Sequence, residues 1–198
     1  VWLAWLGLTL IFPSLVAAVL ALAVWVGLTG GLHLDGLADC CDGLPASVPV
    51  ERRLEILKDP HLGTFGGIGL VLVLFAKAAA LAALAPAQGL GIVLAATAGR
   101  WLILPAGLLP QARPGGMGAD FSLGFRRSAM ILSAVLPLGL AFLLGAQGWI
   151  ALLAALAAAG ALAWLACARL TGVTGDVFGL LVEVTETVIL LSLAGGHG

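Results

Sequence analysis

This sequence contains few charged residues. Only 10% of its 198 residues are Asp, Glu, Lys or Arg, against about 25% in ordinary soluble domains. The 9 basic and 10 acidic side chains are too few to cover a water-soluble globule of this size, and 62% of the residues are hydrophobic. With a mean hydropathy of +1.16, these numbers exclude a soluble domain and a disordered chain and predict an integral membrane protein.

The sequence also lacks a strong net charge, a cysteine pattern and a basic N-terminal segment, and each lack excludes a further class of protein or of signal. The net charge of −1 leaves no basic surface for nucleic acid. Three cysteines, of which Cys40 and Cys41 are adjacent, give neither a disulfide framework nor the spacing of metal ligands. No basic segment precedes the first apolar run, so no cleavable signal is expected. Because the sequence begins inside an apolar stretch, we expect residues 1–12 to be the end of a helix that starts upstream.

Long apolar runs are abundant. They are rich in Ala, Leu and Gly and do not alternate as the strands of a membrane barrel do. A membrane helix needs about 20 such residues. We therefore predict an all-α, polytopic transmembrane helix bundle that forms one domain over residues 1–198, with six full spans and a partial N-terminal one. The full spans are expected at about 14–32, 66–85, 89–109, 129–147, 149–168 and 177–194.

The connections between these spans differ in charge. The loops 33–65, 110–128 and 169–176 carry Arg52, Arg53, Lys58, Arg113, Arg126, Arg127 and Arg169. The turns at 86–88 and 147–148 and the tail at 194–198 carry no Lys or Arg. Positive charge accumulates in cytoplasmic loops, so we predict that the three long loops face the cytoplasm.

Two basic residues, Lys77 and Arg100, fall near the middle of their spans. A charge at that depth costs at least about 2.5–3.5 kcal/mol and normally faces a polar interior. Glu183 and Glu186, one helical turn apart in the last span, are natural counter-charges. A pairing role and a functional role both stay open for the two basic residues.

The most acidic segment reads HLDGLADCCDG and begins at residue 33. Asp35, Asp39 and Asp42 stand at i, i+4 and i+7, so in a helix they share one face. Their mutual repulsion would destabilise that helix, and a bound Mg²⁺, which prefers oxygen ligands and substrate phosphates, would reverse the effect. A solvated acidic loop is the alternative, and it is disfavoured because charge is so scarce elsewhere in the chain.

Acids and bases alternate between Pro49 and Pro60, which are expected to bound a short helix. These residues are Glu51, Arg52, Arg53, Glu55, Lys58 and Asp59. Ordinary pairing along a helix explains part of the pattern. Acids that hold metal beside bases that hold phosphate are also typical of phosphoryl-transfer sites. We favour that role for Arg53, Glu55 and Lys58, and treat His33 as a candidate ligand or proton acceptor.

Two later motifs lie on the same predicted face of the membrane. The run TGVTGD ends at Asp176, at the expected start of the last helix, where it would either cap that helix or join the acidic site. The run ARPGGMGADF contains Arg113 and is interpreted as a substrate-facing loop.

Taken in order, the runs TGGLHLDGLADCCDG, ERRLEILKDPHLGTFG, ARPGGMG and TGDVFG resemble the cobalamin synthase family, also called adenosylcobinamide-GDP ribazoletransferase. The match is dense over the first 70 residues and continues through the chain. The family usually has small residues where this sequence has Cys40 and Cys41, a departure that we treat as neutral.

The resemblance implies a multi-pass enzyme of the bacterial inner membrane with its active site on the cytoplasmic face. It would join adenosylcobinamide-GDP to α-ribazole or its 5′-phosphate, release GMP and require Mg²⁺. Asp35, Asp39 and Asp42 would hold the metal, and Asp39 and Asp42 would act in catalysis, with Asp42 as the general base for a hydroxyl nucleophile. The expected substrate-binding residues are Arg53, Glu55, Lys58, Asp59, His33, Lys77, Arg100, Arg113, Asp176 and Glu183.

Two alternatives remain, and homo-oligomerisation is left open. CDP-alcohol phosphotransferases have a similar Asp-rich motif at the membrane edge, but they carry DG..AR where this sequence has DGLAD. A divalent-cation transporter would use Lys77, Arg100, Glu183 and Glu186 along a pathway. It would distribute charge through the depth of the membrane, whereas this sequence concentrates charge at one face.

Overall fold

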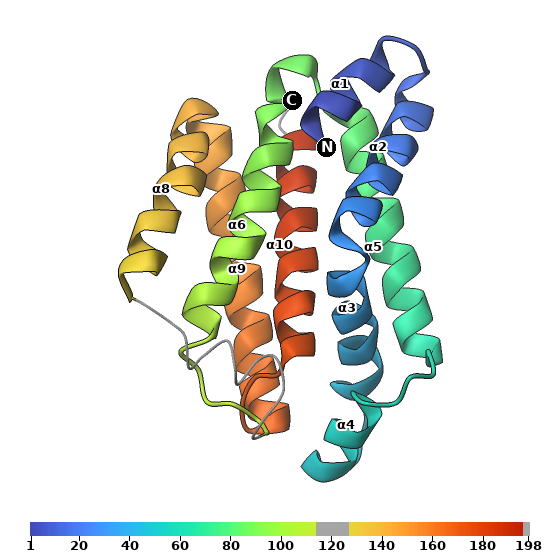
Figure 1. Ribbon diagram of the computed structural model, residues 1–198, viewed down its shortest axis with the longest axis vertical. Helices are drawn as coiled ribbons and strands as arrows, with labels where there is room; N and C mark the ends of the chain where they lie inside the picture. The colour runs from blue at the N-terminus through green and yellow to red at the C-terminus, as the bar shows by residue number, and fades with distance from the viewer. Residues whose placement is uncertain (114–126, 196–198) are drawn as a thin grey trace.

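The computed structural model describes residues 1–113 and 127–195 and is helical almost throughout (Figure 1). Within these residues there is no β-strand, and one isolated bridge joins Gln111 to Val173. The helices are α1 (Trp2–Thr9), α2 (Ser14–Thr29), α3 (Leu32–Gly43), α4 (Val50–Ile56), α5 (Thr64–Ala83), the 3₁₀ helix η1 (Pro86–Gln88), α6 (Leu90–Ala106), α8 (Arg127–Leu143), α9 (Gly145–Leu170) and α10 (Gly175–Ala194).

The prediction of an all-helical membrane protein is confirmed, although the count of spans is not. Four described segments are long and apolar enough to cross a bilayer: α5, η1 with α6, α9 and α10. The pair α2 and α3 makes a fifth if the two helices count as one bent span. Helix α8 has 17 residues, fewer than the full span expected at 129–147.

Several predicted boundaries were wrong. The run at 14–32 is broken at Gly30 and Gly31, and the expected acidic loop that follows is largely the helix α3. The turn expected at 147–148 lies inside α9, because that helix already begins at Gly145. The third charged loop shortens to the residues between Leu170 and Gly175. Most of the expected loop 110–128 lies outside the described residues.

The break between α2 and α3 has a local cause. Gly30 and Gly31 both have positive φ, of 62° and 70°, which glycine adopts without the steric cost that a side chain brings. The two helix axes are 93° apart. The apolar helix α2 ends at this bend. The more polar helix α3 begins there and packs against α5 and α10.

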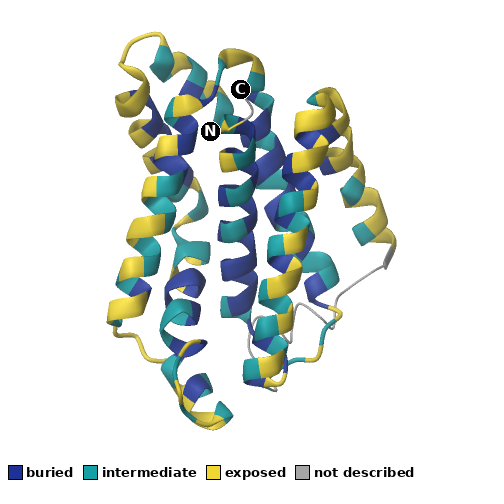
Figure 2. Ribbon diagram, turned by 180° about the vertical axis from the view of Figure 1, so that it is seen from behind, coloured by how far each residue is buried: buried dark blue, intermediate teal, exposed yellow. Residues whose placement is uncertain are grey.

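Helix α10 is the centre of the bundle. Figure 1 shows it surrounded by α3, α5, α6 and α9, and Figure 2 shows it buried along most of its length while its neighbours expose their outer faces. Thirteen of its 20 residues are buried. Much of the surrounding core is alanine, including Ala18, Ala95 and Ala155 with no exposed surface, so the helices approach closely. Glu183 and Glu186 of α10 are therefore buried against neighbouring helices.

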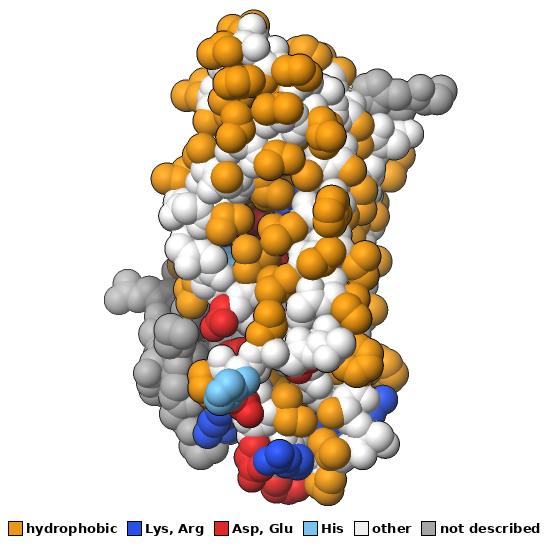
Figure 3. Space-filling view, turned by 90° about the vertical axis from the view of Figure 1, so that its right-hand side faces the viewer, with side chains coloured by type: hydrophobic (Ala, Val, Ile, Leu, Met, Phe, Trp, Pro, Cys, Tyr) orange, Lys and Arg blue, Asp and Glu red, His pale blue; other side chains and the backbone are white. Residues whose placement is uncertain are grey.

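The basic connections gather at one end of the molecule, as predicted. The segment from α3 to α5, the last turns of α6 and α9 and the start of α10 all lie at the lower end in Figure 1. Figure 3 shows charged side chains concentrated there, below a largely hydrophobic surface. We call this the charged end. The α1–α2 connection, η1 and the α8–α9 connection lie at the opposite end.

Candidate active site

The acidic helix α3 lies directly against the first turns of α10. A Cβ atom on Gly36 would stand 2.6 Å from the backbone oxygen of Asp176, and one on Gly179 would stand 2.9 Å from the backbone oxygen of His33. The two backbones touch because neither glycine carries a side chain. This contact brings the carboxylates of α3 beside the carboxylate of Asp176.

A pocket of about 290 Å³ opens at the charged end between α3, the α4–α5 connection and α10. Its polar lining residues are Asp35, Asp39, Lys58, Asp59, His61 and Asp176. Of the predicted site residues, five therefore meet in one pocket. Four acids face one Lys and one His, so the pocket carries an excess of negative charge.

Asp176 is fixed in the first turn of α10. The Thr174 side chain caps the helix by accepting a hydrogen bond from the Val177 N–H, and its hydroxyl donates to Asp176 Oδ2 at 3.1 Å. Asp176 Oδ2 also accepts from Arg113 Nη2 at 2.9 Å. The prediction of a helix starting near Asp176 is confirmed, but the capping residue is Thr174.

Arg113 reaches Asp176 because the chain before it is pinned. The Val173 N–H donates to the Pro110 carbonyl at 2.8 Å, and the Ala112 N–H donates to the Val173 carbonyl at 3.0 Å. Arg113 Nη1 is buried and has no hydrogen-bond partner within residues 1–113 and 127–195. A buried cationic donor without an acceptor costs free energy, so this N–H group is suited to donate a hydrogen bond to an anionic oxygen.

Asp42 does not line the pocket. Its Oδ2 accepts from the Gly63 N–H and its Oδ1 from the Gly66 N–H, both at 2.9 Å. The carboxylate thereby satisfies two donors at the start of α5, where the helix dipole also favours negative charge. These contacts tie α5 to α3.

The α4 helix forms as expected between Pro49 and Pro60. Two of the predicted site residues on it, Arg53 and Glu55, have partners outside the pocket. Arg53 is buried and donates to the carbonyls of Ala46 and Arg169, at 3.0 and 3.2 Å. Glu55 is exposed and pairs with Arg52 at 2.7 Å. Neither residue lines the pocket.

His61 also lines the pocket, although it was not among the residues assigned to the site from sequence. Its backbone N–H and its Nδ1 both lie within hydrogen-bonding distance of Asp59 Oδ1, at 3.0 and 2.6 Å. These hydrogen bonds hold the pKa of Asp59 below its usual range. The signal that could have indicated this arrangement is the short spacing of Asp59, Pro60 and His61, which favours a tight turn.

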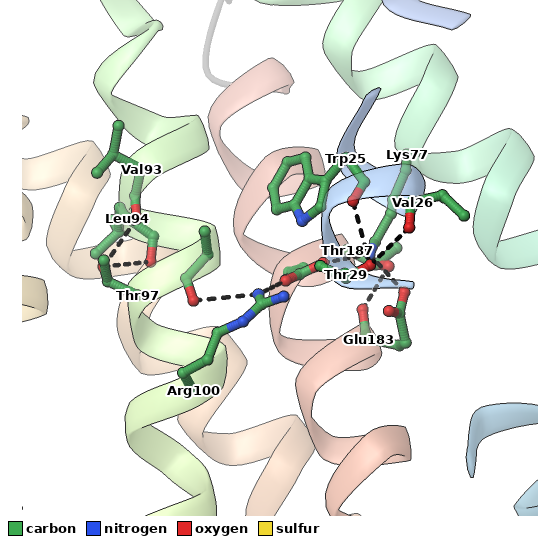
Figure 4. A network of polar contacts seen from close by, with 12 residues as sticks. Trp25, Val26, Thr29, Lys77, Val93, Leu94, Thr97, Arg100, Glu183 and Thr187 are labelled. Carbon is green, nitrogen blue, oxygen red and sulfur yellow. Dashed lines mark hydrogen bonds and ion pairs between the residues drawn. The ribbon is translucent and has the colours of Figure 1, made fainter. Parts of the chain in front are cut away.

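The remaining predicted residues form a separate group in the middle of the bundle. We call Lys77, Arg100, Glu183 and Glu186 the buried ionic cluster. Lys77 Nζ lies 2.5 Å from Glu183 Oε2 and also pairs with Glu186, and Arg100 pairs with Glu186. Figure 4 shows Arg100 reaching from α6 toward α10, with Lys77 and Trp25 on the opposite side. The expectation that the two glutamates serve as counter-charges is confirmed.

His33 lies apart from the pocket. Both of its ring nitrogens are buried and have no hydrogen-bond partner among the residues that the structure describes. The charges of Arg100, Glu183 and Lys77 act on the imidazole. His33 therefore lies near the buried ionic cluster, in the first turn of α3.

The acidic pocket can be tested for its fit to Mg²⁺. Among the described residues, no three His, Cys, Asp or Glu side chains already stand close enough to enclose a metal ion. Asp35, Asp39 and Asp176 nevertheless share one pocket. Mg²⁺ is usually held by one or two carboxylates while substrate phosphates and waters complete its shell, so this donor set fits.

Residues 1–194 match the family model described as cobalamin-5-phosphate synthase. The chain belongs to the cobalamin-5-phosphate synthase family. No solved structure matches it.

Three similar proteins with an assigned function carry the same name. A protein named adenosylcobinamide-GDP ribazoletransferase from Pseudomonas paraeruginosa is 44% identical over 193 residues, covering 92% of this chain and 76% of the relative. Proteins of that name from Roseiflexus sp. and Brevibacillus brevis are each 36% identical. The first alignment covers 94% of this chain and 70% of the relative, and the second covers 96% and 78%. The family that the motifs resembled is thus the family to which this chain belongs.

Proposed function

We propose that this protein joins adenosylcobinamide-GDP to α-ribazole, or to its 5′-phosphate, and releases GMP. Membership of the synthase family over residues 1–194 carries the proposal, and the relatives named for this reaction support it. The acidic pocket lies beside Arg113, whose buried Nη1 has no partner among the described residues, and it is the part of the structure best suited to a diphosphate and its counter-ion.

The chain's own residues give each part of the diphosphate a partner. Arg113, held on one side by Asp176, offers its Nη1 to a phosphate oxygen. Lys58, which follows α4, adds a second positive charge to the lining of the pocket. Asp35, Asp39 and Asp176 are the residues that would hold Mg²⁺, and the ion would offset the negative charge of the diphosphate and of the departing GMP.

The reaction breaks one phosphorus–oxygen bond and forms another. A ribose hydroxyl of the ribazole attacks the phosphorus that bears the cobinamide, and GMP leaves with the bridging oxygen. That hydroxyl must lose its proton to a base, whether or not the ribose carries a 5′-phosphate. We assign the base to Asp39, which lines the pocket, because both oxygens of Asp42 already accept backbone hydrogen bonds.

We place the protein in the bacterial inner membrane with the charged end in the cytoplasm. The basic residues of the described connections all lie at that end, in keeping with the positive-inside rule. In this orientation both substrates and GMP meet the pocket from the cytosolic side.

The decisive experiment is a transfer assay on detergent-purified protein. Adenosylcobinamide-GDP, α-ribazole and Mg²⁺ are supplied, and GMP and the corrinoid product are separated by chromatography. We expect product that disappears on chelation and falls at least 100-fold in Asp39→Asn. Glu51→Gln, which neutralises an exposed acid of α4 outside the pocket, is the matched control and should retain wild-type turnover.

Two results would overturn the proposal. One is the failure of well-folded wild-type protein to form GMP. The other is transfer of a phosphoalcohol from a CDP-alcohol by the same preparation, which would assign the pocket to a different donor. Cation flux into liposomes without any transfer would support the transporter alternative.

A further inference from the structure

Thr174 is a buried polar residue that directly precedes α10, and only 3% of it is exposed. The residue before it, Val173, donates its N–H to the Pro110 carbonyl and accepts at its own carbonyl from the Ala112 N–H. A β-branched side chain has few χ1 rotamers even when it is free. Because its backbone is held on one side and its side chain is enclosed, Thr174 is a rigid point beside the acidic pocket.

The hydroxyl of Thr174 takes part in two hydrogen bonds of opposite sense. It accepts from the Val177 N–H at 3.4 Å and donates to Asp176 Oδ2 at 3.1 Å. A hydroxyl has one proton to donate and two lone pairs that accept, so the two bonds do not compete. The bond from Val177 caps the helix. The bond to Asp176 is not needed for capping, and it acts on the carboxylate.

The bond from Thr174 distinguishes the two oxygens of Asp176. Oδ2 accepts from Thr174 and also from Arg113 Nη2, the latter at 2.9 Å. Oδ1 accepts no hydrogen bond from the residues that the structure describes. Since Asp176 lines the pocket, Oδ1 is the oxygen left to a cation that binds there.

The two donors to Oδ2 differ in how firmly they hold it. Arg113 reaches it with a long side chain that has many rotamers, and its guanidinium is also the group that we assign to a substrate phosphate. Thr174 reaches it with a short, buried side chain at the start of α10. Thr174 is therefore the partner that can keep Asp176 oriented while Arg113 binds phosphate.

We propose that Thr174 is a positioning residue for the transfer reaction. Its hydroxyl holds Asp176 Oδ2 on the side of Arg113 and so leaves Oδ1 to Mg²⁺. The inference rests on the proposed function, in which Asp176 is one of three carboxylates that would hold the ion. Thr174 acts only through Asp176, so its removal weakens the affinity for the cation before it affects any other property of the site.

Binding of Mn²⁺, a paramagnetic substitute for Mg²⁺, tests this role without turnover. Free Mn²⁺ is measured by electron paramagnetic resonance while detergent-purified protein is titrated in the absence of substrates. We expect the dissociation constant to rise about fivefold or more in Thr174→Val, which keeps the shape of the side chain and removes a hydrogen bond to a charged group. Thr174→Ser, which keeps the hydroxyl, should stay within about twofold of wild type. A wild-type protein that binds no Mn²⁺ overturns the inference.

Thr187→Val is the control for a general loss of stability. Thr187 is also a buried threonine of α10, its hydroxyl donates to the Glu183 carbonyl at 2.7 Å, and it does not line the pocket. This variant should lower the melting temperature, as Thr174→Val does, and leave the Mn²⁺ affinity unchanged. An equal loss of Mn²⁺ affinity in both variants would assign the effect to stability and overturn the inference.

The Mg²⁺ dependence of transfer separates positioning from a structural defect. In Thr174→Val the half-saturating Mg²⁺ concentration should rise about fivefold or more, whereas kcat at saturating Mg²⁺ should stay close to that of wild type. A structural defect would lower kcat and leave the half-saturating concentration unchanged, because fewer molecules would be folded. Wild-type Mg²⁺ dependence and Mn²⁺ affinity in Thr174→Val overturn the inference and leave the transferase intact. A wild-type protein that binds Mn²⁺ but forms no GMP overturns the proposed function instead.

Discussion

The charged-end pocket and the buried ionic cluster both bring acids and bases together, but they balance charge differently. In the cluster, two bases meet two glutamates and every charge has a partner. In the pocket, four acids face one lysine and one histidine. A balanced set of charges is complete without a ligand, whereas an excess of one sign is stabilised only when a counter-ion binds. The charges of the buried ionic cluster therefore stabilise the bundle, whereas the excess negative charge of the pocket is suited to a bound cation.

Helix α10 supplies both regions. Its first turn carries Asp176, and Glu183 and Glu186 follow two and three turns later. The two regions are thus connected through a single helix. Four substitutions test how they differ, and they are taken in order of decreasing effect on stability.

Lys77→Met breaks the balance of the cluster most severely. It leaves Glu183 without the partner 2.5 Å away, and loss of one member of a buried pair costs about 3–5 kcal/mol. We expect a clear fall in the melting temperature measured in detergent, with transfer activity lost as a consequence. The double variant Lys77→Met with Glu183→Gln should recover part of that stability. An unchanged melting temperature in the single variant would show that the cluster does not hold the bundle.

Gly36→Ala acts where α3 and α10 touch. The new Cβ would stand 2.6 Å from the Asp176 oxygen, so the backbones must separate, and overpacking of this kind costs about 1–3 kcal/mol. Activity should fall more than stability because Asp39 moves away from Asp176. Gly27→Ala in α2 is the control, since its Cβ would meet nothing within 4 Å. Equal behaviour of the two variants would refute the close contact.

Asp42→Asn tests whether Asp42 has a structural role, in contrast to Asp35 and Asp39, which line the pocket. Asparagine has one acceptor oxygen where aspartate offers two to the N–H groups of Gly63 and Gly66, and loss of a capping interaction costs about 1 kcal/mol. We expect a modest fall in melting temperature and less than a tenfold loss of transfer. A loss as large as that of Asp39→Asn would instead favour Asp42 as the general base.

Arg52→Gln should have the smallest effect. Arg52 and Glu55 form an exposed pair with side chains 64% and 63% accessible, and such pairs are worth about 0–1 kcal/mol. Chemical unfolding should place this variant within error of the wild type. A larger loss would mean that α4 depends on this pair as well as on the buried Arg53.

Much of this arrangement was predictable from sequence because the signals were local. Apolar length predicted the helical bundle, Pro49 and Pro60 bounded α4, and the i, i+4 spacing of Asp35 and Asp39 predicted their shared face. The charge asymmetry of the loops predicted which ends of the helices lie together.

The errors came from contacts that sequence spacing does not encode. Nothing near Asp42 indicates that its carboxylate meets the start of α5, 21 residues later. Arg53 resembles a phosphate ligand until its carbonyl partners are known, one of them 116 residues away. The helical break at Gly30 was missed because an apolar run continues across it, and hydropathy does not register backbone conformation.

The length of α9 has a consequence for how the charged end is built. Its 26 residues span about 39 Å, against a hydrocarbon core of about 30 Å, so α9 is longer than an untilted span requires. The carbonyl of Arg169, in its last turn, accepts a hydrogen bond from Arg53 and so anchors the helix α4. The end of one long apolar helix therefore fixes the short helix after which Lys58 and Asp59 enter the lining of the pocket.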